Sequence, residues 1–406
     1  MAADGIQVAR ASSLEVYEAI NPLALPRIKR AELFSRGTDG IYPEGADTTR
    51  TFHRYGAAFV DDPDQVGLFS KGIGVQPYWY PPAYTAGISD ATLVGYRTIL
   101  TPNKLFFTDE AYADAELFQH RLSRISRSDS FSSEATGLRP TDRERYFEFD
   151  PGERAARHVE RNVVVLCSDE PFSYGSFLFR VVPKAKAVRD LGLTGTTCIA
   201  FADQKPFMDL LNFCGISEQT ILQHDINAVT RVDRAIIPSL RNPHAYLDPE
   251  SCELYAELRA RYGEPSSGRK VYVSRVSINQ EGWSTRTMVN EGELIARLEA
   301  MGFDILEPEH LSVREQIKAF SSASMIVGPS GSGLFNTMFC HPGTKVIDIQ
   351  SEPQWIYSYT GMYASLQLNY GIFVGKADPA DTKAVHRRWA VNIDALIGRI
   401  RAFLAD

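Results

Sequence analysis

The sequence has few cysteines, no excess of basic residues and no long apolar run. Its 5 cysteines are scattered among 406 residues, which fits neither a disulfide framework nor paired metal ligands, so we expect reduced core thiols. The formal net charge of -7 argues against a nucleic-acid partner, because such partners need clustered Lys and Arg. No stretch is long and apolar enough to span a bilayer, and residues 1–5 lack the start of a secretion signal. We therefore expect a cytoplasmic protein, with peripheral contact at the inner membrane face left open.

What is present is a large apolar fraction arranged in two successive patterns. Hydrophobic residues make up 44% of the chain and charged residues 23%, enough to bury the cores of two or three domains. From residue 162 onward, short apolar runs alternate with amphipathic stretches, which is typical of α/β folds. We predict two Rossmann-like doubly wound domains facing a cleft. Strands are expected at residues 163–167, 197–201, 235–238, 270–274, 303–306, 324–327 and 345–349, and helices at 177–191 and 205–214.

The first 160 residues are predicted to form a β-rich and irregular extension. Short runs between residues 91 and 107 predict a small β-meander. The aromatic and proline-rich segment 76–82 favours a packed loop over a strand or a stacking platform, and the polar stretch 121–161 favours a linker or an exposed insertion. The predicted division is an N-terminal extension (1–160), an acceptor domain (161–248), a donor domain (249–384) and a C-terminal helix packing back on the domains (385–406).

Helix boundaries are well marked in the second pattern. Asn290 and Glu293, and likewise Ser312 and Glu315, have the spacing of a capping box, and Gly302 is expected to end the first of these helices. An amphipathic stripe between residues 385 and 404 predicts the last helix.

Residues 325–336 are the most informative stretch, because an apolar run breaks into a Gly-rich turn and restarts as a helix. Backbone N–H groups at a helix start suit a phosphate. A tight turn without a ligand is the alternative, since the stretch matches neither Walker A nor the dinucleotide fingerprint. The candidate binding residues here are Gly328, Ser330, Gly331, Ser332, Gly333, Leu334 and Asn336.

In order and spacing, this second region resembles the family 61 glycosyltransferases. The resemblance is carried by residues 272–275, 286–291, 298–303, 315–316, 328–336 and 346–349, and extends more weakly to residues 169–183. It implies a bacterial inverting, metal-independent transferase of the GT-B type that needs no cofactor. Such an enzyme moves a sugar from a nucleoside diphosphate, with a uridine diphosphate sugar favoured, to a hydroxyl of a glycan or glycolipid acceptor. Capsule and exopolysaccharide synthesis is the expected setting, and the oligomeric state stays open.

The resemblance also assigns donor-binding residues. Arg275 and Arg286 can pair with phosphate, because guanidinium matches phosphate oxygens bidentately; surface ion pairs are the alternative. Asp348 can accept from ribose hydroxyls or can cap. Asn290 is favoured as a helix cap, and Glu291 either holds Arg286, touches the donor or stabilises the first helical turn. Gln316 is expected on a helix surface.

Two serines stand where the family usually has histidine, Ser176 and Ser330. Serine is no general base near neutral pH without help, so Asp169 and Glu170, which follow the first strand of the acceptor domain, are the leading candidates for the base. His244 is a further catalytic candidate, and Tyr174, Ser176 and His224 are acceptor-side candidates.

Three readings compete with an active transferase. The serine substitutions leave open a catalytically impaired subunit that binds a nucleotide sugar or glycan. A different α/β enzyme, such as a dehydrogenase, is disfavoured because no Gly-x-Gly-x-x-Gly turn follows the first strand. An acidic divalent-metal site at residues 61–64 is also disfavoured, because acidic residues around a proline usually form a turn.

Overall fold

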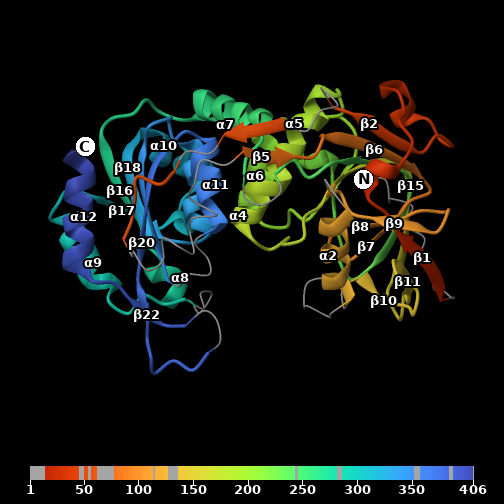
Figure 1. Cartoon of the computed structure of the whole chain (residues 1–406). Helices are drawn as coiled ribbons and strands as arrows, with labels where there is room; N and C mark the ends of the chain where they lie inside the picture. Colours follow the sequence, from red (N-terminus) through yellow and green to blue (C-terminus); the bar gives the residue numbers. More distant parts are fainter. Residues whose placement is uncertain are drawn as a thin grey trace. The chain divides into compact units, whose positions relative to one another are not determined.

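The computed structural model describes residues 14–44, 50–53, 56–61, 77–112, 115–126, 136–242, 246–280, 286–351, 357–383 and 387–405. The chain forms two compact units. Figure 1 labels their helices and strands. Unit 1 comprises Met1–Thr51 and Trp79–Pro243, and unit 2 comprises Phe52–Tyr78 and His244–Asp406. Across the described ranges, every helix is too short or too polar to serve as a membrane span.

Unit 1 is built on a 12-stranded mixed sheet. Its strands β15, β12, β13 and β14 lie in that order and run parallel, whereas β6 and β7 join β15 antiparallel. The strands are β1 (Glu15–Ala19), β2 (Gly40–Pro43), β6 (Tyr84–Ser89), β7 (Thr92–Val94), β8 (Thr98–Leu100), β9 (Leu105–Phe107), β10 (Leu138–Pro140), β11 (Tyr146–Phe149), β12 (Ala156–Leu166), β13 (Cys198–Ala200), β14 (Ile221–Gln223) and β15 (Val229–Pro238).

The predicted meander is confirmed as β7, β8 and β9. For the described residues 136–161, the prediction of a linker or exposed insertion is wrong, because they hold β10, β11 and the start of β12. In β11, Phe147 and Phe149 alternate with exposed or half-buried neighbours and pack into the core beside β1. That period of two marks a strand even though the surrounding sequence is polar.

One continuous helical run covers the parallel part of this sheet. It consists of α4 (Tyr174–Ser176), a π-helical turn η3 (Phe177–Val181) and α5 (Val182–Asp190). An α-helical bond from residue 183 would end on the carbonyl of Phe179, but Pro183 has no N–H. The Asn242 side-chain amide donates to that carbonyl at 2.8 Å instead. Among the described residues of unit 1, the other helices are η1 (Pro22–Ala24), η2 (Arg30–Phe34), α2 (Ala115–Ser126), α6 (Lys205–Phe213) and η4 (Glu218–Thr220).

Unit 2 is built on a six-stranded, fully parallel sheet with the order β17, β16, β18, β19, β20, β4. Numbered from its first strand after β4, this order is 2-1-3-4-5, that of a doubly wound sheet, and its switch point lies between β16 and β18. The strands are β4 (Phe59–Val60), β16 (Arg269–Val273), β17 (Asp304–Leu306), β18 (Ala323–Pro329), β19 (Lys345–Gln350) and β20 (Asn369–Val374).

Helices cover both faces of the unit 2 sheet, as Figure 1 shows. Alternate residues of β16, β18 and β19 pack with α9 and α12 in one apolar cluster, while α10 and α11 pack on β18 and β20. The helices are α7 (Pro249–Tyr262), α8 (Val276–Gln280), α9 (Glu291–Glu299), η6 (Pro308–His310), α10 (Val313–Ser322), η7 (Ser332–Phe339), α11 (Tyr357–Ser365) and α12 (Ile393–Ala405); a small hairpin joins β21 (Lys376–Ala377) to β22 (Trp389–Ala390).

Several predicted boundaries need correction. The last helix begins at Ile393, because Trp389 lies in β22. The Ser312 capping box is confirmed, but Asn290 makes no side-chain cap on α9. The segment predicted as a loop contains strand β5 (Pro77–Tyr80), which pairs with β3 (Arg50–His53). Proline is tolerated as the first residue of a strand, and the following aromatics favour one.

The five cysteines are all free thiols, as predicted, and four of them are buried.

Candidate functional site

The switch point of the unit 2 sheet brings the predicted donor residues together. Strand β16 ends at Val273 and is followed by Arg275, while β18 ends at Pro329 and is followed by the Gly-rich turn. Ligands of doubly wound sheets bind outside the carboxyl ends of the strands at such a point. The sheet order therefore places Arg275 and Gly331 beside each other at the position where a ligand is expected.

The three glycines of the turn are required by close approach rather than by backbone conformation. A Cβ atom on Gly328 or Gly333 would lie 2.9 Å from the Val273 side chain, so both glycines let β18 and η7 pack on β16. A Cβ atom on Gly331 would overlap the Arg275 guanidinium and would lie 4.0 Å from Nη2 of Arg286. Gly331 thus leaves the space that the two guanidinium groups occupy.

Two like charges meet at this point. Burial lowers the pKa of Arg275, and the positive charge of Arg286 lowers it further. Arginine nevertheless stays protonated in proteins. An anion bound between the two guanidinium groups would relieve their repulsion and accept hydrogen bonds from both. The arrangement of the two guanidinium groups would therefore suit an anion.

Glu291 positions this arginine through the backbone. It is the first residue of α9 and is 2% exposed, and its Oε1 accepts from the Arg275 backbone N–H at 2.8 Å and from the Tyr272 hydroxyl at 3.2 Å. Asn290 instead exchanges two hydrogen bonds with the backbone of Val391, at 2.8 and 3.2 Å. Glu291 therefore fixes the end of β16, and Asn290 anchors the start of α9.

Asp348 lies beneath the turn, in the strand next to β18. It is fully buried, and burial raises its pKa to about 7. Its Oδ2 accepts from the Tyr363 hydroxyl at 3.0 Å, and Gln350 donates to the Ser330 hydroxyl at 3.1 Å. The Ser330 backbone N–H donates to the carbonyl of Ile349. This N–H group is therefore engaged in the fold rather than aimed at a ligand.

Helix α11 adds residues that sequence reasoning missed. Tyr363 holds Asp348, and Tyr359 interacts with Ser330 and electrostatically with Arg286. Their segment carries no motif, and only the fold brings it under the turn. The one available signal was the run of three tyrosines between residues 357 and 363.

Gln316 and Asn336 form a buried structural link, so the prediction of a surface position for Gln316 is wrong. The Gln316 amide donates to the carbonyls of Pro308 and Leu311 at 2.9 and 3.0 Å, and its oxygen accepts from Asn336 at 2.8 Å. Asn336 also donates to the Gly333 carbonyl. These bonds fix η7, and with it the Gly-rich turn. Ser332 and Leu334 are the first and third residues of η7.

In unit 1, the predicted base Asp169 belongs to a charged network. Its carboxylate pairs with Arg97 at 3.4 Å and with Arg180. Arg97 is itself buried and pairs with Asp109 at 3.1 Å, and Asp109 pairs with the buried Lys184 at 2.5 Å. These ion pairs anchor the turn after β12 to the helical run above it.

The remaining unit 1 candidates lie around the same turn. Glu170 is exposed, and Tyr174 opens α4 and is partly exposed. Ser176 is 3% exposed and its hydroxyl lies 3.0 Å from that of Ser168. His224 is buried, its Nε2–H donates to the Gly95 carbonyl at 2.6 Å, and burial lowers its pKa. His244 lies outside the described residues.

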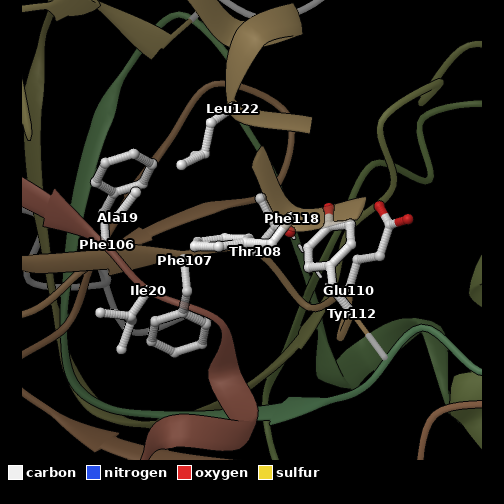
Figure 2. Close-up of a pocket in the computed structure, with 9 residues that line it drawn as sticks. All are labelled: Ala19, Ile20, Phe106, Phe107, Thr108, Glu110, Tyr112, Phe118 and Leu122. Carbon is white, nitrogen blue, oxygen red and sulfur yellow. Dashed lines mark hydrogen bonds between the residues drawn. The ribbon is translucent and has the colours of Figure 1, made fainter. Parts of the chain in front are cut away.

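Unit 1 also contains a small apolar pocket between β1, β9 and α2, shown in Figure 2. Its wall is made largely of aromatic and aliphatic side chains, with the carboxylate of Glu110 at one side. Glu110 also pairs with Arg97 at 2.7 Å. Such a lining does not suit a phosphate. The pocket is lined by Ala19, Ile20, Phe106, Phe107, Thr108, Glu110, Tyr112, Phe118 and Leu122.

No group of acidic, His or Cys side chains able to hold a metal ion occurs in the part of the chain that the structure describes. Of the acidic segment weighed as a metal site, Asp61 pairs with Arg399, and residues 62–64 lie outside the described residues.

Part of the chain matches a known family. Residues 174–347 match the family model Glycosyltransferase 61. The matched segment begins at α4 and includes Arg275, Arg286, Gly331 and the first half of β19. It supports the family resemblance and a glycosyltransferase activity. No curated protein matches the chain.

Proposed function

We propose that the protein is an inverting, metal-independent glycosyltransferase that binds its nucleoside diphosphate sugar in unit 2. One observation carries the proposal: the guanidinium groups of Arg275 and Arg286 meet over Gly331, at the switch point of a parallel sheet. The proposal includes two Rossmann-like domains of the GT-B type, a glycan or glycolipid acceptor, a cytoplasmic location and a role in polysaccharide or surface-glycan assembly.

The chemistry explains why two guanidinium groups suit this task. The acceptor oxygen attacks the anomeric carbon, and the bond from that carbon to the diphosphate breaks, so the electron pair leaves with the diphosphate. Charge grows on the leaving group as this bond breaks, and fixed positive groups stabilise it most in the transition state. Arg275 and Arg286 supply that charge without a metal. A uridine nucleotide is the donor that we expect.

The acceptor hydroxyl must lose its proton to a base. Both oxygens of Asp169 are engaged by guanidinium groups, whereas Glu170 is exposed on the same turn. We therefore favour Glu170 over Asp169 as the base within this proposal. Tyr174 and Ser176 follow on the adjoining helix.

The test is calorimetric binding of uridine, guanosine, cytidine and thymidine diphosphates, first with chelator and then with magnesium or manganese. One nucleotide should bind in chelator, and Arg275→Ala should weaken it by about 10- to 100-fold, the effect of losing charged hydrogen bonds. Gly331→Ala should act similarly, because the added methyl displaces the Arg275 guanidinium.

Two matched variants control for this experiment. Arg297→Ala removes an exposed arginine of α9, and Gly398→Ala adds a methyl where nothing lies within 4 Å. Both should bind nucleotide normally. Equal affinity in Arg275→Ala and Arg297→Ala, with both proteins folded, would refute the donor site.

A catalytically impaired binding subunit is the second candidate. It is favoured by Ser176 and Ser330, which are buried and hydrogen-bonded internally where the family usually has histidine. This protein would bind the nucleotide sugar but neither transfer nor hydrolyse it. Turnover of the bound donor distinguishes the two candidates.

A further inference from the structure

Unit 1 presents a phenylalanine to solvent at the turn after β12. Phe172 is 56% exposed, although large apolar side chains of this type are usually buried. It directly precedes Ser173, the N-cap of the helical run that begins at Tyr174. An exposed aromatic ring on a short turn between buried elements is a feature that binding sites use.

Two further aromatic rings stand beside it. The ring centroids of Phe172 and Phe201 are 4.7 Å apart with an interplanar angle of 81°, and those of Phe172 and Tyr96 are 6.4 Å apart at 90°. Both are edge-to-face contacts, which favour a fixed ring orientation. Phe201 and Tyr96 are only partly buried. We call these three residues the aromatic platform.

Each loop that carries a platform ring is fastened by a side chain. The Gln223 amide binds both the N–H and the carbonyl of Ala202 at 3.0 Å, next to Phe201. His224 binds the carbonyl of Gly95, next to Tyr96.

The third loop is held in the same way. The Ser168 hydroxyl accepts from the Glu170 backbone N–H at 3.2 Å, and the Glu170 carbonyl accepts from the Ser173 N–H at 3.1 Å. The platform is therefore preorganised, which lowers the entropic cost of binding.

The position of the platform is that of a ligand site. Phe172 follows β12 and Phe201 follows β13, and His224 connects the Tyr96 turn to the end of β14. These three strands are parallel, so their carboxyl ends share one edge of the sheet, where α/β proteins bind ligands.

The polar groups around the platform specify the ligand. Glu170 and Asp203, each two residues from a platform ring, are exposed. Carboxylates accept hydrogen bonds from hydroxyl groups and repel anions. A pyranose ring offers an apolar C–H face to an aromatic ring and hydroxyls at its rim, whereas an acidic sugar would be repelled.

We propose that the aromatic platform of Tyr96, Phe172 and Phe201 binds a neutral pyranose ring of the glycan acceptor. This inference rests on the proposed function, because it supplies the acceptor subsite of that reaction. A ring stacked on Phe172 brings its hydroxyls to the turn that carries Glu170, two residues away.

The test is saturation-transfer NMR with the intact protein and four probes at millimolar concentration. Cellotriose, maltotriose and chitotriose are neutral, and trigalacturonate is the anionic probe. At least one neutral probe should receive saturation, strongest on the C–H protons of one ring face, and trigalacturonate should receive none.

Three variants test whether the binding of the neutral probe depends on Phe172. Phe172→Ala should lower the affinity for the neutral probe about fivefold or more, while Phe172→Trp should keep or raise that affinity. Val16→Ala, which trims an exposed apolar residue of β1 in the same unit, should change nothing. Binding equal in Phe172→Ala and Val16→Ala would overturn the proposal, as would no saturation of any neutral probe.

The same samples separate this inference from the proposed function. Arg275→Ala should leave glycan saturation unchanged, because that residue lies in the donor site. Glycan binding without nucleotide binding would keep the platform and refute the transferase. Nucleotide binding without glycan binding would refute the platform and keep the transferase.

Discussion

Asp348 shows how a single buried residue sets a property of the whole site. Burial raises its pKa from the ordinary 3.8 to about 7, against the opposing effects of Tyr363, Gln350, Ser330 and the charge of Arg286. Near neutral pH the carboxyl group therefore exchanges its proton. This places a titrating group beneath the proposed diphosphate site.

The unfolding free energy should consequently fall as the pH rises from about 4 to about 7. Between pH about 4 and about 7, Asp348 keeps a proton in the folded protein that it releases in the unfolded chain. The contribution of Asp348 to the unfolding free energy is therefore fully present at the acid end of this range and is lost toward neutral pH. The limiting slope is about 1.4 kcal/mol per pH unit. Urea unfolding of the protein and of Asp348→Asn across this range should give a difference that moves in favour of the variant as pH rises.

A constant difference between the two proteins would contradict the raised pKa. Glu315→Gln is a suitable control, because Glu315 is fully exposed and its pKa is lowered by its bonds to Ser312. It should not reproduce the neutral-pH trend.

The candidate site was partly predictable at the residue scale. The family resemblance had assigned Arg275, Arg286 and Gly331 together to donor binding, and the fold places them close to one another. The contacts of Glu291 and Gln316 were not, because a buried carboxylate or amide leaves the same sequence signal as an exposed one. Their partners are backbone groups, the Tyr272 hydroxyl and the Asn336 amide, and no motif records such contacts.

At the scale of elements, α10 and η7 act as one support for the Gly-rich turn. Gln316 crosses between them, binding Pro308, Leu311 and Asn336. Replacing it leaves three buried or half-buried polar groups without this partner. The position of η7, and of the turn before it, depends on this link.

Gln316→Met should therefore destabilise the protein by about 2–4 kcal/mol, since buried polar groups that lose their partners are costly. It should also weaken nucleotide binding through the displaced turn. Lys318→Met, on the exposed side of the same helix, should change stability by about 0.5 kcal/mol or less. The measurement is denaturant unfolding of both variants. Similar unfolding midpoints for Gln316→Met and Lys318→Met would show that the link through Gln316 is dispensable.

Strand prediction succeeded where apolar runs alternate with amphipathic stretches and failed where that alternation is absent. The strands β16, β18 and β19 lie within a residue or two of their predicted limits. Strands β10, β11 and β20 were missed, the first two because charged residues surround them and the last because no predicted helix preceded it. Tertiary pairing decides such segments, and propensity is too weak to show it.

At the scale of the whole molecule, the two units are not consecutive pieces of chain. Strand β4 comes from residues 59–60 yet completes the sheet of unit 2 beside β20. Phe59 packs edge-to-face on Phe403 at 5.3 Å, fills the space left by Gly371, and lies under Arg399. No local pattern predicts this pairing, because its partners lie at the other end of the sequence.

Phe59→Ala should lower the unfolding free energy by about 2 kcal/mol, less than for a fully buried phenylalanine. The loss should appear in unit 2. Limited proteolysis with mass spectrometry should therefore find new cleavage sites between residues 246 and 405, and Val16→Ala should produce none there. New sites confined to unit 1 would contradict the assignment of β4.

The β4 pairing also has a consequence for synthesis. A ribosome makes Phe59 and Val60 long before β20, so the strand emerges without the sheet to which it belongs. Unit 1 has all its strands by Pro238 and can fold while translation continues. Unit 2 must wait for residues 369–403 and then capture a segment released much earlier.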